Sequence, residues 1–365
     1  MFNEIYKDKT VLVTGHTGFQ GGWLSLWLKK LGANVIGYSL EPPTKPSFFE
    51  SVKLNEELEH NIGDIRDGSK LNEIITQCKP EIIFHLAAQS LVRKSYNNPI
   101  ETFETNILGT ANILESVRQT ESVKAVMIMT SDKCYDNKEF TQPHKETDPM
   151  GGFDPYSASK GAAELITASY RDSFFKNGMT NCGIATARSG NVIGGGDWSE
   201  NRIIPDSIKK LTNDDDIIIR NPESKRPWQY VLESISGILW LTAKLFEEPA
   251  KFNQGWNFGP RKNTDILSVR NLVEKIIKEW GSNQSFIINK ENSSLHESEI
   301  LLLDSSKSEN KLGWRNIFEI DELISETVSW YKMYNNKRED MKEFSLKQIE
   351  KYGIKATQDN LAWIN

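Results

Sequence analysis

Residues 10–22 read "TVLVTGHTGFQGG", an apolar run followed at once by glycines spaced three residues apart. Gly15, Gly18 and Gly21 permit a tight turn and a close approach of the backbone to a ligand. The amphipathic segment that comes next, closing at Gly32, offers the N–H groups and positive dipole end of a helix N-terminus. The stretch therefore predicts a strand, a phosphate-binding turn and a helix that bind a dinucleotide, the alternative being glycines that serve only strand–helix packing.

Strand-like apolar runs alternate with helical segments through the rest of the first half of the chain. Four further runs are expected to be strands, at residues 34–38, 81–88, 124–131 and 182–190. They are nearly continuous in apolar residues, as strands covered on both faces should be. The pattern predicts an α/β fold with a doubly wound, Rossmann-like parallel sheet.

The alternation of strand-like and helical segments ends near Gly194, where the glycine-rich stretch "GGGDWSENRIIPD" begins. We interpret much of the chain beyond this point as a smaller C-terminal substrate lobe. The expected division is a NAD-binding Rossmann domain over 1–193 with a returning segment at about 227–260, a substrate-binding lobe over 194–226 and 261–334, and a helical tail over 335–365.

Composition excludes several classes of function. The net charge of −6 lacks the basic excess typical of nucleic-acid binding, although local arginines still suit a small anionic substrate. Cys78, Cys134 and Cys182 lie far apart and give neither a disulfide framework nor a metal-binding spacing. No segment approaches the ~18 consecutive apolar residues of a membrane span, and the N-terminus lacks a signal-like stretch. We expect a cytoplasmic protein with no metal, no membrane partner and no nucleic-acid partner.

The stretch "DPYSASKGAAEL" (154–165) places a phenol and an ammonium group one helical turn apart. Asp154 suits an N-cap and Pro155 the first helical position. Tyr156 and Lys160 would then lie on one face, where the ammonium group is expected to lower the pKa of the phenol for acid–base work. Taken alone, the spacing is also compatible with an exposed pair.

A third polar motif, "TSDKCYD" (130–136), directly follows the strand-like run at 124–131. Ser131, Asp132 and Lys133 would therefore lie at the carboxyl edge of the sheet, where ligands bind in parallel α/β folds. They could handle protons there, or they could form a hydrogen-bonded loop.

Together, the glycine spacing and the Tyr-x-x-x-Lys pair resemble the extended branch of the short-chain dehydrogenase/reductase superfamily. With "SDKCYDN", "SGNVIGGGDWSENRIIPD" and "RNPESKRPWQYVLE", nearly the whole chain is similar to the NAD-dependent nucleotide-sugar 4,6-dehydratases, and to the branch that acts on CDP-glucose. The resemblance implies oxidation at C4 of the sugar, loss of water across C5–C6 and return of the hydride to C6. Most of these dehydratases carry Asp-Glu where this chain has Asp132 and Lys133.

The resemblance implies a role for each member of the third motif. Ser131 would hydrogen-bond the substrate hydroxyl, and Asp132 would protonate the departing 6-hydroxyl. Lys133 would take the C5 proton, or would position a water that does so. Since a direct ion pair would oppose a neutral Lys133 and a protonated Asp132, we predict that the two side chains diverge around the sugar.

The resemblance also implies binding residues. The expected cofactor contacts are Gly15, Thr17, Gly18, Phe19, Gln20, Gly21, Asp64, Ile65, Ala87, Ala88, Gln89, Asn106, Tyr156 and Lys160. The expected substrate contacts are Gln89, Asn191, Arg202 and Arg226, the arginines because a guanidinium fork suits a diphosphate.

One feature of the dinucleotide fingerprint is missing. Tyr38 and Ser39 stand where an acid should end the second strand, and Glu41 comes two positions later. No arginine stands in the immediate stretch to favour a 2′-phosphate, so NAD is expected in preference to NADP. His16, inside the glycine loop, could touch the pyrophosphate or face solvent.

Two other classes of function stay open. One is an epimerase or a 4,6-dehydratase acting on GDP- or dTDP-linked sugars, and the other is a dinucleotide-binding protein without turnover. Helices expected at 99–118 and 155–176 have apolar outer faces that suit a homodimer or homotetramer, although sheet packing would account for them equally.

Overall fold

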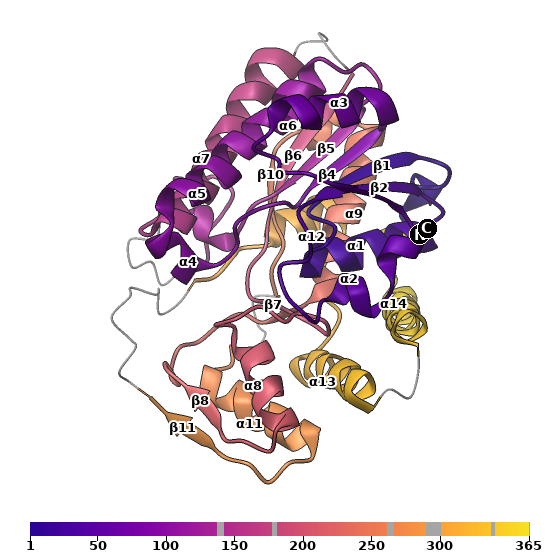
Figure 1. Ribbon diagram of the computed structural model, residues 1–365. Helices are drawn as coiled ribbons and strands as arrows, with labels where there is room; N and C mark the ends of the chain where they lie inside the picture. The colour runs from indigo at the N-terminus through magenta and orange to yellow at the C-terminus, as the bar shows by residue number, and fades with distance from the viewer. Residues whose placement is uncertain (137–141, 177–180, 261–265, 290–300, 337–339, 365) are drawn as a thin grey trace.

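The computed structural model describes residues 1–136, 142–176, 181–260, 266–289, 301–336 and 340–364, and its centre is a parallel sheet (Figure 1). In these residues seven strands pair in the order β10-β6-β5-β4-β1-β2-β3, all parallel. The strands are β1 (Thr10–Thr14), β2 (Asn34–Ser39), β3 (Glu59–Ile62), β4 (Ile82–His85), β5 (Ala125–Met129), β6 (Gly183–Arg188) and β10 (Gly255–Asn257). The predicted doubly wound parallel sheet is confirmed.

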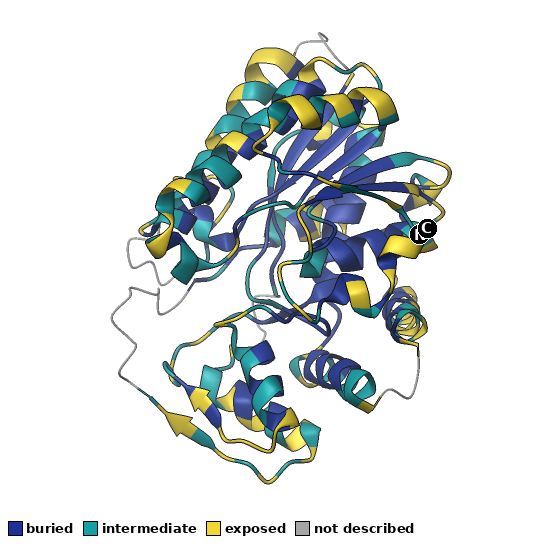
Figure 2. Cartoon of the chain, viewed as in Figure 1, coloured by how far each residue is buried: buried dark blue, intermediate teal, exposed yellow. Residues whose placement is uncertain are grey.

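Helices cover both faces of the sheet. Along β1, Val11 and Val13 face one core and Leu12 faces the other, as the strand period of two requires. The first core is closed by α1 (Phe19–Lys30) and α9 (Val231–Glu247), and the second by α3 (Gly68–Cys78), α6 (Gly109–Arg118) and α7 (Pro155–Tyr170). Figure 2 shows the strands buried between these layers, as their continuous apolar sequences predict.

Shorter elements connect these layers. The helix expected at 99–118 consists of α5 (Pro99–Phe103), a π-helical turn η3 (Glu104–Leu108) and α6, and a second π-helical turn, η5 (Arg171–Phe175), extends α7. The remaining ones are η1 (Phe2–Glu4), α2 (Phe48–Ser51), η2 (Leu54–Glu56), α4 (Val92–Asn97), η4 (Asp132–Cys134), α10 (Pro249–Phe252) and η6 (Ala362–Ile364).

The second half of the chain adds a smaller body, drawn below the sheet in Figure 1. It contains two short parallel sheets, β7–β9 and β8–β11. Its elements are β7 (Val192–Ile193), α8 (Ile203–Thr212), β8 (Ile217–Ile219), β9 (Gln229–Tyr230), α11 (Val269–Trp280), β11 (Phe286–Ile288) and α13 (Ile320–Asn336). Between α11 and α13 in the sequence, α12 (Ser306–Leu312) returns to the main sheet and packs beside β10. The expected domain boundaries stay a prediction.

The two ends of the chain lie together beside α1. Near the C-terminus, α14 (Met341–Gln358) brings Tyr352 edge-on to Trp27, with the ring centroids 5.9 Å apart. Phe2 stacks on Trp363 at 5.1 Å. Within the described ranges, the chain has no helix of the length and apolarity that a membrane crossing requires.

Candidate active site

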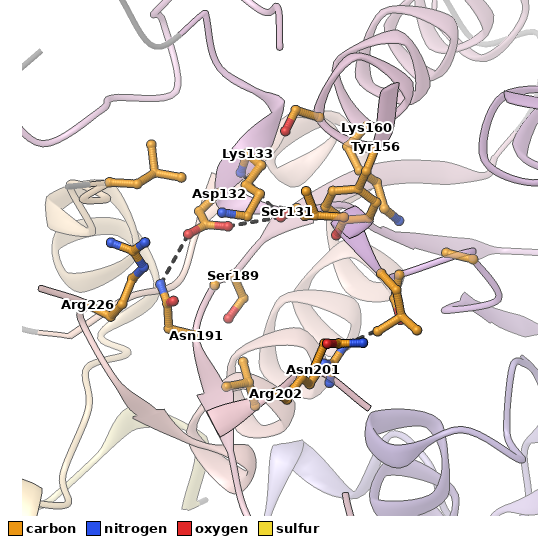
Figure 3. A pocket seen from close by; sticks show the side chains of 18 of the residues that line it. Ser131, Asp132, Lys133, Tyr156, Lys160, Ser189, Asn191, Asn201, Arg202 and Arg226 are labelled. Atoms are coloured by element: carbon orange, nitrogen blue, oxygen red, sulfur yellow. Dashed lines mark hydrogen bonds between the residues drawn. The ribbon is translucent and has the colours of Figure 1, made fainter. Parts of the chain in front are cut away.

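A cavity of about 960 Å³ opens at the carboxyl ends of the central strands, between the sheet and the smaller body (Figure 3). It is lined by the loops after β4, β5 and β6, by the start of α7, and by residues of the smaller body. The predicted site residues that line it are Gln20, Ala88, Ser131, Asp132, Lys133, Tyr156, Lys160, Asn191, Arg202 and Arg226. One cavity thus brings together residues from segments far apart in sequence.

The start of α7 sets the positions of the phenol and the ammonium group. Asp154 caps the helix by accepting a hydrogen bond from the Ser157 N–H at 3.0 Å, and Pro155 comes next, as predicted. Tyr156 and Lys160 are both buried, and Lys160 Nζ donates to the Met129 carbonyl at the end of β5 at 3.3 Å.

Burial governs the protonation of both groups. It lowers the pKa of Lys160 to about 8 and raises the pKa of Tyr156 to about 12. A side-chain hydrogen bond with Ser131 lowers the Tyr156 pKa, and the charge of Asp132 raises it. The prediction that the phenol's pKa lies below its ordinary value is wrong for this structure, because desolvation outweighs the hydrogen bond with Ser131 and the charge of Arg202, which lower that pKa.

The third motif turns sharply where β5 ends. Ser131 Oγ accepts the Lys133 N–H at 3.2 Å, which caps the short turn η4, and it donates to Asp132 Oδ1 at 2.9 Å. Asp132 is 3 % exposed, and its other oxygen accepts from Asn191 Nδ2 at 3.3 Å. In the described part of the chain, Asp132 and Lys133 form no ion pair.

The loop after β6 fixes the place of the Asp132 carboxylate. A Cβ built on Gly190 would lie 2.0 Å from Asp132 Oδ2, so the carboxylate occupies the space that a side chain there would need. Asn191 comes next with φ +52°, a left-handed backbone that asparagine tolerates better than most residues. Asn191, expected to contact the substrate, lines the cavity and donates a hydrogen bond from its amide to Asp132.

A buried charge network below the cavity was not predicted from the sequence. Glu164, one turn after Lys160 on α7, accepts from Arg188 Nη2 at 2.8 Å and from the hydroxyls of Thr130 at 2.5 Å and Thr186 at 2.7 Å. Burial would raise the pKa of Glu164, but Arg188 and the hydroxyls hold it below its ordinary value. In the sequence, the one acid within the otherwise apolar stretch "GAAELI" (161–166) could have indicated a buried charge that needs a partner.

The glycine loop has the shape that a pyrophosphate needs. Gly15 has φ +78°, and a Cβ on it would lie 2.7 Å from the Ala87 backbone nitrogen. A Cβ on Gly21 would lie 2.1 Å from the Gly15 carbonyl oxygen. Gly18 is the N-cap of α1, and among the described residues no side chain caps it, which leaves first-turn N–H groups for an anionic ligand. Phe19 and Gln20 begin the helix.

The end of β2 braces this loop. Thr17 Oγ1 lies 2.8 Å from Ser39 Oγ and donates to the Leu40 carbonyl at 2.9 Å. The Tyr38 hydroxyl donates to the Asp64 carbonyl at 3.1 Å. Asp64 itself pairs with Arg66 at 2.6 Å, which lowers the pKa of its carboxyl group.

His16 does not face solvent, which corrects one of the two alternatives considered. Its side chain is fully buried, with Nε2 2.7 Å from His60 Nδ1. A Cβ on Gly37 of β2 would lie 2.5 Å from the imidazole ring. Burial, together with His60, lowers the pKa of His16 to about 3.

The other expected cofactor residues form a framework beside the cavity. Asn106 accepts the Gln89 N–H at 2.8 Å and donates to Ser159 Oγ at 2.8 Å, which ties the loop after β4 to α7. The Gln89 side chain donates to Thr102 Oγ1 at 3.0 Å and is not among those that line the cavity. Ile65 packs where a Cβ on Gly109 would lie, 2.6 Å away. Their contacts with a ligand stay predictions.

The two arginines reach the cavity from the smaller body. Arg202 Nη1 pairs with Asp197 Oδ2 at 2.9 Å, and Asp197 is itself buried. Arg226 Nη1 donates to the Lys225 carbonyl at 3.0 Å. Figure 3 shows Arg226 beside Asn191 and Arg202 beside Asn201.

Comparison with known proteins gives concordant matches. Residues 12–327 match the model of a family described as GDP-mannose 4,6 dehydratase. A CDP-glucose 4,6-dehydratase of Salmonella typhimurium is 49% identical over 352 residues, which cover 96% of this chain and 97% of that protein.

Solved structures share the fold. A UDP-glucose 4-epimerase of Thermotoga maritima with UDP-glucose has a TM-score of 0.76 at 22% identity and covers 89% of this chain and 99% of its own. A dTDP-glucose 4,6-dehydratase of Bacillus anthracis in complex with NAD has a TM-score of 0.73 at 20% identity, covering 90% and 98%.

Proposed function

The chain belongs to the GDP-mannose 4,6-dehydratase family, and from this premise we propose that it is a hydro-lyase with NAD as cofactor that converts CDP-D-glucose to CDP-4-keto-6-deoxy-D-glucose. The observation that carries the proposal is that Ser131, Asp132 and Lys133 line the same cavity as Tyr156 and Lys160. A simple sugar oxidation needs only the serine, tyrosine and lysine of this set, whereas loss of water needs a further acid and a further base.

The residues present fit NAD. The loop of Gly15, Gly18 and Gly21 with the start of α1 would hold the pyrophosphate, and Tyr156 with Lys160 would hold the nicotinamide ribose. Bound NAD would supply reversible acceptance of a hydride from the sugar. No arginine ends β2 to hold the 2′-phosphate of NADP, which supports NAD over NADP, although the acid that would hold the ribose hydroxyls of NAD is also missing there.

Within this proposal each polar residue handles one proton. Tyr156, which lines the cavity together with Ser131, takes the proton of the 4-hydroxyl. Because a 4-keto group acidifies the C5–H bond, Lys133 or a water it positions can remove that proton and later return it. Asp132 protonates the 6-hydroxyl, which leaves as water. Arg202 and Arg226 would hold the diphosphate.

The choice of sugar nucleotide rests on the long similarity to the Salmonella enzyme. Purified protein should convert CDP-glucose at least about tenfold faster than dTDP-glucose or GDP-glucose at equal concentration, with the 4-keto-6-deoxy product identified by NMR. Preference for either of the other nucleotides would contradict the substrate, and a C4 epimer as product would favour the epimerase alternative.

We also propose a homodimer, or a tetramer built from it, in a reducing, cytoplasmic compartment. Ile100, Leu108 and Leu165 are 65%, 56% and 60% exposed on the neighbouring segments α5, η3 and α7, and the three cysteines are free. Light scattering should find a dimer or a tetramer in the wild type, and a smaller species in Leu165→Glu. A wild-type monomer would contradict this part of the proposal.

A further inference from the structure

The end of β2 presents a neutral hydroxyl group where a dinucleotide fold normally has an acid. In such folds, a carboxylate about 20 residues after the glycine turn binds the ribose hydroxyls of the adenosine. Ser39 is the last residue of β2, which lies beside β1 in the sheet (Figure 1). The Gly15 N–H donates to the Tyr38 carbonyl at 3.1 Å, so the glycine turn lies directly against this strand end. Ser39 therefore occupies the place of the ribose-binding acid.

The Ser39 hydroxyl is held from the glycine loop. Its Oγ lies 2.8 Å from Thr17 Oγ1, and Thr17 Oγ1 donates to the Leu40 carbonyl at 2.9 Å. A carbonyl oxygen can only accept, and a hydroxyl group has a single hydrogen, so the Thr17 hydrogen goes to Leu40. Ser39 must then supply the hydrogen of its bond with Thr17.

This arrangement leaves Ser39 Oγ as an acceptor. A hydroxyl oxygen carries two lone pairs, and among the described residues no donor occupies those of Ser39. Thr17 and Ser39 are only 3% and 7% exposed, so the surrounding loop restricts both hydroxyl groups. An acceptor at this place can bind a ribose hydroxyl as one oxygen of a carboxylate does, but without the charge.

The acids near this strand end do not restore that charge. Glu41 is exposed, so solvent and salt screen its carboxylate. The loop after β3 is tied to Ser39, whose carbonyl accepts the Gly63 N–H at 2.9 Å, but Asp64 in that loop is paired with Arg66 at 2.6 Å. A phosphate group at the end of β2 would therefore meet little repulsion.

We propose that Ser39, oriented by Thr17, binds the adenosine 2′-hydroxyl of NAD in place of an acid, and that this neutral contact admits NADP almost as readily as NAD. A carboxylate at the same place would repel the 2′-phosphate of NADP. The neutral contact loses only one hydrogen bond when NADP replaces NAD, so NAD keeps a small advantage. The inference rests on NAD as the cofactor of the proposed function and does not depend on the sugar nucleotide.

The test measures dissociation constants by titration calorimetry of the full-length protein freed of bound nucleotide. The ligands are NAD, NADP and the NAD analogue that lacks the adenosine 2′-hydroxyl. In the wild type, NADP and the 2′-deoxy analogue should each bind about 3- to 10-fold more weakly than NAD, which is the loss of one hydrogen bond. In Ser39→Ala, which removes the acceptor, NAD should bind no more tightly than its 2′-deoxy analogue.

Two carboxylate variants test the role of charge. Ser39→Asp, which restores the acid, should weaken the binding of NADP relative to NAD by about 10²-fold or more. Glu41→Gln is the matched control, and removal of this exposed carboxylate should leave all three dissociation constants unchanged. Weaker binding of NAD with tighter binding of NADP in Glu41→Gln would show that Glu41 holds the ribose, which would overturn the proposal.

Two results that need no folded Ser39→Asp variant would also overturn it. One is a wild type that binds NADP about 10²-fold or more weakly than NAD. The other is an equal loss of affinity for NAD and its 2′-deoxy analogue in Ser39→Ala, since Ser39 would then only brace the loop. Both results leave the dehydratase function intact, whereas a wild type that binds neither NAD nor NADP would contradict the proposed cofactor and this inference together.

Discussion

At the scale of single residues, the position of the Asp132 carboxylate depends on the absence of a side chain at Gly190. The end of the Asp132 side chain stands where a Cβ would be, with Cγ 2.1 Å from it. The backbone of Gly190 is not left-handed, so alanine is compatible with the fold and Asp132 can rotate away. The proposed acid would then be displaced.

Gly190→Ala should therefore lower kcat by about 10²-fold while the protein stays folded, because proton transfer requires close placement. The matched control is Asp132→Asn, alone and combined with Gly190→Ala. The double variant should lose no more activity than Asp132→Asn, since both changes remove the same group. Additive losses would show that Gly190 acts elsewhere.

Burial of the Lys160 ammonium group should lower the free energy of unfolding of the protein. Its pKa is about 8 in the folded protein against an ordinary 10.5. Below pH 8 it is charged in both states and the full cost of burial applies. Between pH 8 and 10.5 only the unfolded chain binds the proton, so stability from this group rises with pH.

Lys160→Met should raise the free energy of unfolding at pH 7 by about 1–3 kcal/mol and abolish turnover. The gain should shrink as pH rises from 8 towards 10.5. Urea unfolding at pH 7 and pH 10, with turnover assayed in parallel, measures both effects. A loss of stability at pH 7 would contradict the assigned cost of burial.

At the scale of elements, the Glu164–Arg188 pair joins three of them. Glu164 lies on α7, Arg188 ends β6, and Thr130 directly follows β5. Both charged side chains are 5% exposed. The pair therefore holds the helix that carries Tyr156 and Lys160 against the strand ends that carry the third motif.

Glu164→Gln should lower the free energy of unfolding by about 3–5 kcal/mol, because it leaves the Arg188 charge buried without its partner. The double variant Glu164→Gln/Arg188→Met removes both charges and should recover most of that loss. Urea unfolding of the wild type and both variants decides this. Equal stability of the single and double variants would show that Arg188 does not depend on Glu164.

Local motifs were predictable, and contacts between distant segments were not. The glycine loop and the α7 start each lie within one short stretch, where turn and helix chemistry decide the backbone. The edge strand β3 reads "EHNI" and has no apolar pattern, so it was missed. The contact of Asn191 with Asp132 spans 59 positions and depends on a left-handed residue in a loop, which local sequence does not reveal.

At the scale of the whole molecule, the parallel sheet explains why one cavity holds all the chemistry. Parallel strands direct their carboxyl ends to one edge, so the loops after β1, β4, β5 and β6 converge there. The smaller body supplies Arg202 and Arg226 to the same cavity. A hydride removed from C4 and returned to C6 would then stay within a single cavity.

The most direct measurement traces that hydrogen with CDP-glucose deuterated at C4. The proposed function predicts a 4-keto-6-deoxy product whose C6 methyl group carries the deuterium, detected by NMR after reaction in ordinary water. A product with the deuterium still at C4, or with the deuterium lost to solvent, would contradict it.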